Sequence, residues 1–582
     1  MANSRLNKLG NYLRPHWRII LFGTVALLIV NLLGVYIPTL IGDSIDRLDG
    51  NFSFEQLSRT SLLLLLLSVF MWCFRMFSRT SIFGVGRQVE FGLKQRIFQH
   101  LLRIEPGYFS NNTSGDLINR ATSDVDNIRR LVGFAVLSFI NIIFAYGFTL
   151  PAMLQISVRL TILAIAVYPV MLITVQLFSG KLRRYQEEIQ VKLSDLSELI
   201  QEDMSGMALI RIYAQENQER EAFRQKNQEL LAANLKLART RNFLFPVIEG
   251  ISYVSLLILL FIGTKAIADG QITVGGFIKL VLFVERLVFP TALLGFTISA
   301  FQQGEVSVDR VESIVKAEPK IKNSSDPTVL DKREIRGKLT ARNLTYTYPG
   351  SDVPALYNIN FKIKPGERVA IVGSIGAGKT TLANAIPRLL NIEAEELFLD
   401  DTDVTELDLA SLRQAIAYVP QDSFLFSTTI KNNIRYGEPL AETSEVIQSA
   451  KQAQIHPEIL TFPQEYDTLV GERGITLSGG QRQRTSLARA LTVEAKILIL
   501  DDALSSVDNE TATRILDSLS SSRDRKTVIF ISHQLSAAAS CDRILVMDRG
   551  KIVQDGTHET LVGETGLYQS LWQQHQLKEV LN

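Results

Sequence analysis

The chain has 582 residues, too many for a single hydrophobic core, so we expect more than one domain. Its 61 basic and 60 acidic side chains leave a formal net charge of +1, which argues against nucleic acid as a partner. The two cysteines, Cys73 and Cys541, lie in different halves of the chain and exclude a disulfide framework and a cysteine-rich metal site.

Long apolar stretches dominate the N-terminal half. Each is long enough to supply the roughly 20 residues that an α-helix needs to cross a bilayer. The six predicted spans are residues 17–41, 59–84, 131–153, 157–180, 244–268 and 274–300. The polar segments after the second and fourth spans have a helical pattern with few glycines or prolines, so we expect these helices to continue well beyond the membrane.

The charges around the first span predict its orientation. Basic side chains precede it and mainly acidic side chains follow it, which is typical of a cytoplasmic N-terminus. An even number of spans then returns the chain to the cytoplasm. Lys279, Glu285 and Arg286 fall inside the sixth span, where ionisable groups are costly and often mark a transport pathway. Glu285 and Arg286 point about 100° apart on a helix, so they need not pair.

The polar, proline-containing residues 316–336 read as a linker. They separate a transmembrane domain, residues 1–315, from residues 337–582, where short apolar strands alternate with helical segments. The predicted fold is therefore a polytopic α-helical membrane domain followed by an α/β nucleotide-binding domain of the P-loop class.

The second domain contains a complete phosphate-binding loop. The letters GSIGAGKTT follow an apolar strand and open a helix, so a chance glycine turn is improbable. Glycines let backbone amides approach the phosphates, Lys379 reaches the β and γ phosphates, and Thr380 is placed to ligate Mg²⁺. The predicted ATP-binding residues here are Gly373, Ser374, Gly376, Ala377, Gly378, Lys379, Thr380 and Thr381.

Asp501 and Asp502 end the apolar run Ile497–Leu500, which is typical of a central parallel strand. An isolated acid there would more often be a solvated strand end, but a phosphate loop upstream favours Asp501 as a Mg²⁺ ligand. A second anion site is predicted where LSGGQ precedes a helix, at Ser478, Gly479, Gly480 and Gln481. An ordinary helix N-cap is the alternative.

These motifs, in this order and spacing, resemble the ATP-binding cassette of ABC transporters. Six spans followed by one cassette is similar to the half-transporters of the multidrug and lipid exporter group, bacterial inner-membrane proteins among them. The resemblance implies that Tyr348 stacks on adenine, Gln421 approaches Mg²⁺ and the attacking water, and His533 contacts the γ phosphate. It also implies that two cytoplasmic segments, residues 114–129 and 211–219, couple the membrane domain to the cassette, and that Glu472 lies near them.

Asp502 departs from the family pattern, in which a glutamate positions the attacking water. Aspartate is shorter by one methylene, and a misplacement of about 1 Å can cost on the order of 10²-fold in rate. In this family the LSGGQ segment, called the signature, of one cassette faces the phosphate loop of another. The chain therefore requires a second half-transporter. We expect a heterodimer in which this chain carries the degenerate site, as in some bacterial multidrug exporters.

The expected activity is ATP-driven export of amphipathic compounds, drugs or lipids, by a membrane-embedded ABC-type ATPase. Three alternatives remain open at this point. They are a homodimeric exporter, an importer of siderophore-like compounds built on the exporter fold, and a regulatory or channel subunit that binds ATP without acting as a motor.

Overall fold

The structure is a computed structural model that describes residues 10–48, 54–331, 333–471, 474–507, 509–520 and 526–581. Glu472, predicted to lie near the coupling segments, is outside the described residues. The chain divides into two compact units. One comprises Met1–Arg103 and Asn112–Ala317, and the other comprises Ile104–Asn111 and Glu318–Asn582. The boundary at Ala317 falls inside the predicted linker range 316–336.

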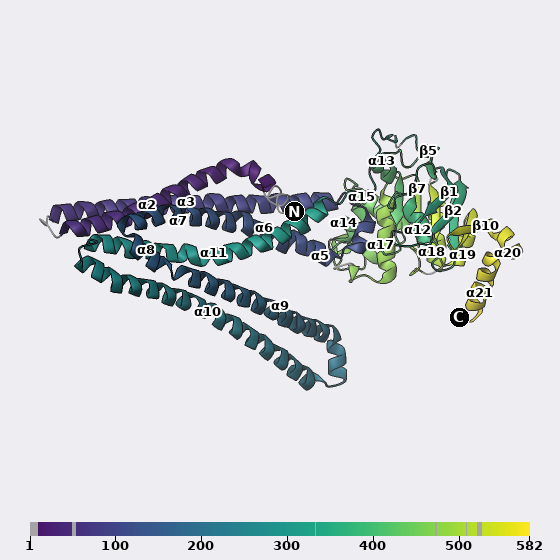
Figure 1. The fold of residues 1–582 in the computed structure, drawn as a ribbon. Coiled ribbons are helices and arrows are strands. Elements are labelled where there is room, and N and C mark those ends of the chain that lie inside the picture. Colours follow the sequence, from purple (N-terminus) through teal and green to yellow (C-terminus); the bar gives the residue numbers. More distant parts are fainter. Residues whose placement is uncertain are drawn as a thin grey trace. The chain divides into compact units, whose positions relative to one another are not determined.

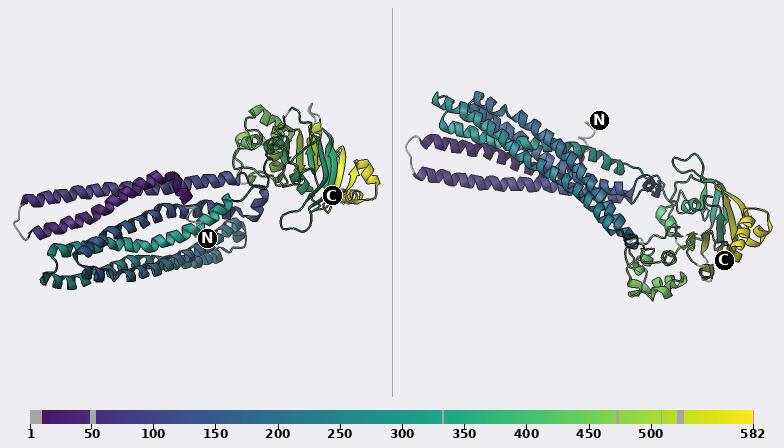
Figure 2. Two further views of the ribbon diagram at one scale, coloured as in Figure 1. Left: turned by 45° about the horizontal axis from the view of Figure 1, so that its top comes forward. Right: turned by 90° about the horizontal axis from the view of Figure 1, so that it is seen from below.

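Helices joined by short turns make up the described residues of the first unit. Its elements are η1 (Arg14–His16), α2 (Trp17–Leu48), α3 (Phe54–Leu101), α5 (Ser114–Asn119), η2 (Arg120–Asp124), α6 (Val125–Arg130), η3 (Leu131–Ala135), α7 (Val136–Ile156), α8 (Val158–Ile165), α9 (Tyr168–Ile212), α10 (Glu216–Ala268) and α11 (Val274–Val315). Thr113, Ser157 and Thr273 cap α5, α8 and α11 with side-chain oxygens that accept backbone N–H groups. Figure 1 shows α9 and α10 as a long antiparallel pair, and Figure 2 shows the same pairing from two further sides.

Five helical stretches are long and apolar enough to cross a membrane: Gly10–Arg47, Glu55–Leu101, Ser114–Ile156, Val158–Ile212 and Glu216–Ala268. They contain the first five predicted spans except Ser157, the N-cap of α8. The sixth, residues 274–300, lies in α11, a continuous helix whose apolar stretch is interrupted by Lys279, Glu285 and Arg286. A sixth span therefore stays a prediction.

Small residues let the helices of this unit approach closely. A Cβ on Gly295 of α11 would lie 2.7 Å from Val175 Cγ1 of α9, and one on Gly304 would lie 2.6 Å from Leu131 Cβ. Buried hydroxyls are satisfied across the same interfaces, since Tyr168 donates to the Val284 carbonyl at 2.7 Å. The interior of this unit is thus packed and hydrogen-bonded between helices, as an apolar solvent requires.

The predicted coupling segments both lie in the first unit. Residues 114–129 form α5, η2 and part of α6. Residues 211–219 comprise the end of α9, the turn after it and the start of α10. The segment of the helical half that belongs to the second unit is Ile104–Asn111, which contains α4 (Pro106–Asn111). Within the second unit, Glu105 accepts a hydrogen bond from the Lys320 backbone at 3.0 Å. The coupling roles of residues 114–129 and 211–219 therefore stay predictions.

The second unit contains two sheets and the helices around them. The strands are β1 (Leu339–Tyr346), β2 (Leu356–Ile363), β3 (Arg368–Gly373), β4 (Leu397–Leu399), β5 (Thr402–Asp403), β6 (Ile416–Val419), β7 (Ile497–Asp501), β8 (Thr527–Ile531), β9 (Arg543–Asp548) and β10 (Lys551–Gly556). The helices after α4 are α12 (Lys379–Ala385), α13 (Leu409–Gln414), α14 (Ile430–Arg435), α15 (Thr443–Gln452), α16 (His456–Ile459), η4 (Glu465–Asp467), α17 (Gly479–Thr492), α18 (Asn509–Ser520), α19 (Leu535–Ala539), α20 (His558–Gly563) and α21 (Leu567–Leu581).

The larger sheet has the order β10-β9-β3-β8-β7-β6, and the smaller has the order β2-β1-β4-β5. Strands β3, β6, β7, β8 and β9 pair in parallel, and each of β3, β7 and β8 is a nearly continuous apolar run. Alternate residues enter different clusters, since Leu498 and Leu500 lie in one and Ile497 and Ile499 in the other. A sheet covered on both faces explains why its strands are apolar at every position.

The register brings the functional strand ends to one edge. Asp501 at the end of β7 pairs with Ile531 at the end of β8, and Ile371 near the end of β3 also pairs with Ile531. The loops after β3, β7 and β8 therefore begin beside one another. Such an edge is where parallel α/β sheets place their ligand sites.

Candidate ATP site

The loop between β3 and α12 depends on glycine for its shape. Gly373, Gly376 and Gly378 have φ values of +148°, +78° and +94°, a region that residues with a Cβ rarely adopt. A Cβ on Gly378 would also lie 2.4 Å from the Ala355 carbonyl oxygen. The loop thus exposes closely spaced backbone N–H groups of the kind that cradle phosphates.

Lys379 begins α12 and folds over this loop. Its ammonium donates to the carbonyl oxygens of Gly373 at 2.9 Å and Ser374 at 2.8 Å. Burial lowers the pKa of Lys379, and the nearby carboxylates of Asp501 and Asp502 oppose that shift. The ammonium is therefore held over the loop and close to the acid pair, where it can contact a phosphate.

Asp501 is 1% exposed and lies beside the first turn of α12. Its Oδ1 accepts a hydrogen bond from Thr380 Oγ1 at 3.1 Å, and its Oδ2 lies 3.3 Å from the Tyr418 hydroxyl. Burial raises the pKa of Asp501, and these two hydroxyls oppose the rise. A carboxylate beside a threonine hydroxyl is an oxygen donor set that suits Mg²⁺.

Asp502 has a left-handed backbone, with φ at +49°. Its N–H donates to the Ile531 carbonyl at 2.9 Å, and its buried Oδ1 has no hydrogen-bond partner among the described residues. Burial raises the pKa of Asp502, and the neighbouring His533 and Lys379 oppose the rise. A buried carboxylate oxygen without a partner favours a ligand that brings a donor or a cation.

One cavity of about 310 Å³ collects most of the predicted residues. It is lined by Tyr348, Gly376, Ala377, Gly378, Lys379, Thr380, Thr381, Gln421, Asp501, Asp502 and His533, together with Ala355, Ile375 and Ile531. The Tyr348 hydroxyl lies 3.2 Å from Thr381 Oγ1, and the residue remains 42% exposed. An exposed aromatic face next to a phosphate-type loop is a suitable surface for a base.

The predicted signature residues start α17. Ser478 Oγ accepts the Gln481 N–H at 3.3 Å, and Gln481 Oε1 accepts the Ser478 N–H at 2.9 Å, which is a capping box. The N-cap alternative is thus correct as local structure, and the anion-binding role stays a prediction. Within the described part of the chain, the cavity that holds Lys379 and Asp501 includes none of Ser478, Gly479, Gly480 and Gln481. A single chain does not bring its two predicted anion sites together.

Two site residues were missed by sequence reasoning. Tyr418 lies in β6, the strand next to β7, and its hydroxyl is also 3.0 Å from Asn384 Oδ1. Gln483 of α17 donates to Ser505 Oγ at 2.8 Å and accepts the Ser506 N–H at 2.8 Å, linking the signature helix to the segment after Asp502. The available signal for Tyr418 was its position at a strand end near Gln421. Gln483 carries no signal of its own.

The residues present fit ATP and Mg²⁺. The glycine cradle and Lys379 suit the phosphates, while Thr380 and Asp501 suit the metal. Burial raises the pKa of both adjacent carboxyls, so a divalent cation would supply compensating charge. When bound, Mg²⁺ neutralises charge on the phosphate oxygens.

Replacing Gly378 by alanine is expected to weaken ATP binding at least about tenfold, because the left-handed backbone costs 1–2 kcal/mol with a Cβ and tenfold corresponds to 1.4 kcal/mol. The clash with the Ala355 carbonyl adds to this cost. Titration of the purified full-length protein with a fluorescent ATP analogue measures the effect. Gly563→Ala is the matched control, because a Cβ there meets nothing within 4 Å. Equal affinity of the Gly378 variant and the wild type would contradict the assignment of the loop.

Comparison with known proteins agrees with this site. Residues 20–291 match the protein-family model described as ABC transporter transmembrane region, and residues 356–505 match the model described as ABC transporter. The multidrug resistance-like ATP-binding protein MdlA of Escherichia coli (strain K12) is 32% identical over 577 residues, covering 99% of this chain and 97% of that protein. The ATP-dependent lipid A-core flippase of Syntrophus aciditrophicus (strain SB) is 33% identical over 574 residues, covering 99% of this chain and 94% of that protein.

A solved structure shares the fold across the whole chain. It is a bacterial Atm1-family ABC exporter with ATP bound, with a TM-score of 0.77 and 24% identity, covering 97% of this chain and 99% of that chain. The relatives above are at least 30% identical over nearly their full length, which is sufficient to assign a family. The chain therefore belongs to the ABC transporters, as an exporter with a helical transmembrane domain and an α/β ATP-binding domain.

Proposed function

We propose that this chain is one half of a heterodimeric exporter that uses ATP to move amphipathic or hydrophobic compounds, drugs or lipids, out of a bacterial cell across the inner membrane. Relatives of nearly the same length are named for multidrug resistance and for flipping a lipid A core, which supports this substrate class. The chain supplies one transmembrane domain and one cassette, and its partner supplies the others.

The membrane domain in this proposal has six spans, with α11 as the sixth. Support comes from its 42 helical residues and from the packing of its glycines against α9 and η3. The N-terminus and the cassette are cytoplasmic, since basic residues precede α2 and acids follow its apolar stretch.

In the cassette, we assign nucleotide contacts to the phosphate loop and Tyr348, and Mg²⁺ contacts to Thr380, Asp501 and Gln421. Asp502, Gln421 and His533 surround the position of the attacking water. Their shared cavity supports this assignment. Nucleotide closes two cassettes on each other, and the membrane domains follow because the closed pair has the higher affinity for ATP.

Asp502 is the single observation that carries the heterodimer. Lys379, Asp501, Gln421 and His533 line one cavity with Asp502. Its carboxylate is nevertheless one methylene shorter than the family's glutamate, and its Oδ1 has no partner among the described residues. A shortfall of about 1 Å slows hydrolysis on the order of 10²-fold while leaving ATP binding intact. Selection of an impaired acid beside an intact signature at Ser478 is understandable if that signature completes a competent site on another chain.

The test compares this chain alone with the chain co-purified with its partner half. We expect slow, poorly vanadate-sensitive ATP turnover from the chain alone and turnover about 100-fold faster from the complex, following the misplacement estimate for Asp502. ATP binding should be alike in both preparations. Brisk, vanadate-sensitive turnover by the chain alone would sink the heterodimer and favour a homodimeric exporter.

A further inference from the structure

The helical unit contains a pocket of about 350 Å³ whose charge is strongly one-sided. Arg75 and Arg79 of α3 and Arg286 of α11 line it, against a single acid, Glu285, so the lining carries a net charge of +2. Among the described residues, none of these three arginines forms an ion pair with a carboxylate. Uncompensated cations within apolar helices are costly and mark functional sites by default.

Arg286 is held in place by neutral groups only. Its Nη2 donates to the backbone carbonyl and to Oδ1 of Asn31, each at 3.1 Å. Asn31 is 2% exposed, lies within the apolar stretch of α2, and donates in turn to Asn141 Oδ1 at 3.1 Å. This network orients the guanidinium and leaves its charge available, because amide oxygens cannot neutralise it.

The backbone of α2 is shaped to admit this guanidinium. A Cβ on Gly34 would lie 1.3 Å from Arg286 Nη1 and 2.0 Å from its Cζ, so glycine is required for the observed position. Gly34 is three residues after Asn31, which places both on one face of the helix. Because the helix has a glycine where the guanidinium packs, the position of Arg286 is a specific feature of this packing.

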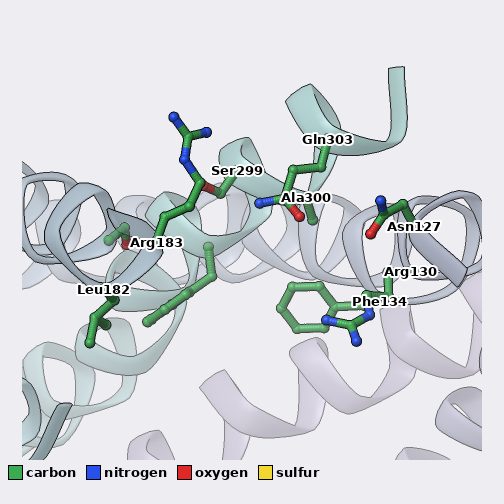
Figure 3. A pocket seen from close by; sticks show the side chains of 10 residues that line it. Asn127, Arg130, Phe134, Leu182, Arg183, Ser299, Ala300 and Gln303 are labelled. Carbon is green, nitrogen blue, oxygen red and sulfur yellow. The ribbon is translucent and has the colours of Figure 1, made fainter. Parts of the chain in front are cut away.

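A second pocket in the same unit provides a contrast (Figure 3). It is lined by Arg130 and Arg183, which the figure labels, and by Phe134 and Gln303. Both arginines have acid partners, since Arg130 Nε lies 2.8 Å from an Asp126 oxygen and Arg183 Nε lies 3.8 Å from a Glu187 oxygen. Positive charge is thus compensated at this pocket and uncompensated at the one around Arg286.

The rest of the Arg286 pocket is largely apolar. Its lining includes Leu27, Val30, Leu137, Phe289, Pro290 and Leu293, alongside Ser138 and Asn141. An apolar wall suits a hydrocarbon chain or ring system, and a bidentate guanidinium suits a phosphate or carboxylate. The two features together select one class of ligand.

We propose that this pocket binds the acidic headgroup of an anionic amphiphile, which the transporter carries as substrate. This deepens the proposed export function and rests on it, since it narrows the cargo from amphipathic compounds in general to those with a phosphate or carboxylate. Arg286 contacts the headgroup, and Arg75 and Arg79 add charge on the facing helix.

The test measures binding to the purified full-length transporter, with its partner half, in a neutral detergent by native mass spectrometry. The probes are oleoyl lysophosphatidate and monooleoylglycerol, which share an acyl chain and differ in charge. We expect the anionic probe to bind at least about tenfold more tightly, the gain typical of a charge-assisted hydrogen bond. Equal binding of the two probes would overturn the proposal.

Four substitutions test which residues give the selectivity. Arg286→Gln and Arg79→Gln should reduce the difference between the probes, and Arg286→Lys should retain part of it. Gly34→Ala keeps every charge but displaces the guanidinium, so it should reduce the difference as well. The control is Arg59→Gln, an exposed α3 arginine paired with Glu55 at 2.5 Å, which should change neither the probe difference nor ATP turnover. Unchanged selectivity in the monodisperse Arg286→Gln and Arg79→Gln variants would contradict the site.

Two further measurements distinguish an amphiphile site from a site for free anions, and a failure of this proposal from a failure of the export function. Inorganic phosphate should not displace the lysophosphatidate. If it does, the pocket binds free anions and the proposal of an amphiphile site is wrong. ATP turnover of the same wild-type preparation tests the export function separately. Intact turnover with equal probe binding overturns only the anionic headgroup, whereas absent turnover overturns the proposed function itself.

Discussion

Replacing Gly479 by aspartate in the assembled transporter is expected to lower ATP turnover by at least about 100-fold, because a like charge facing the phosphates costs several kcal/mol and 2.7 kcal/mol corresponds to 100-fold. The substitution should not harm the fold of the cassette. A Cβ at Gly479 would meet Ser506 Oγ at 3.4 Å, an ordinary contact, and aspartate in the first turn of α17 is favourable to the helix dipole. Steady-state ATPase of the complex measures the loss.

The neutral variant Gly479→Asn is the matched control, since it differs from aspartate only in charge. It should retain clearly more turnover than Gly479→Asp. The companion substitution Asp502→Asn should leave turnover of the complex within about twofold of the wild type, since the partner's site does most of the work when this site is already slowed on the order of 10²-fold. A complex that tolerates Gly479→Asp, or that stops when Asp502 is neutralised, would refute the assignment of the working site to the partner.

The cassette could be predicted closely because its chemistry lies in contiguous motifs at strand ends. Gly373 to Thr381, Asp501 and His533 each follow an apolar strand, and parallel strands bring their carboxyl ends to one edge. The prediction failed where contacts depend on strand order. Tyr418 reaches Asp501 only because β6 pairs with β7, and no local pattern announces that neighbour.

The helical half was less predictable because hydropathy indicates the length of an apolar helix but not which other helices it packs against. The first five apolar stretches are confirmed as helices long and apolar enough to cross a membrane. The Arg286 pocket, by contrast, is lined by Asn31, Arg75 and Arg286, which come from three different helices. Its charge balance became visible only when the packing of α2, α3 and α11 was known.

The helix α4 illustrates a different limit. The resemblance pointed to residues 114–129 and 211–219 as coupling segments and not to this six-residue helix, which is grouped with the cassette unit. Pro106 and Gly107 begin that helix, and both residues read as a break in a periodic pattern. A helix of six residues has too few turns to show a helical periodicity in the sequence.

Replacing Asp502 by glutamate is expected to convert this chain's site into a hydrolysing one, with a gain on the order of 10²-fold, because the added methylene moves the carboxylate about 1 Å towards the cavity. Asp502 already faces the cavity that holds Lys379 and His533, and its Oδ1 has no partner among the described residues. Photolabelling with 8-azido-ATP identifies the nucleotide retained on this chain within the complex. The wild-type chain should retain mainly the triphosphate, and the glutamate variant mainly the diphosphate.

Asp502→Gln separates chemistry from backbone strain. The native residue has φ at +49°, a left-handed conformation that aspartate tolerates better than longer side chains. Glutamine shares the length and the backbone cost of glutamate but cannot act as a base, so it should retain the triphosphate. If the glutamate and glutamine variants both retain the triphosphate while ATP binding is intact, the missing methylene is not what limits this site, and the geometry around Asp502 must be slow for another reason.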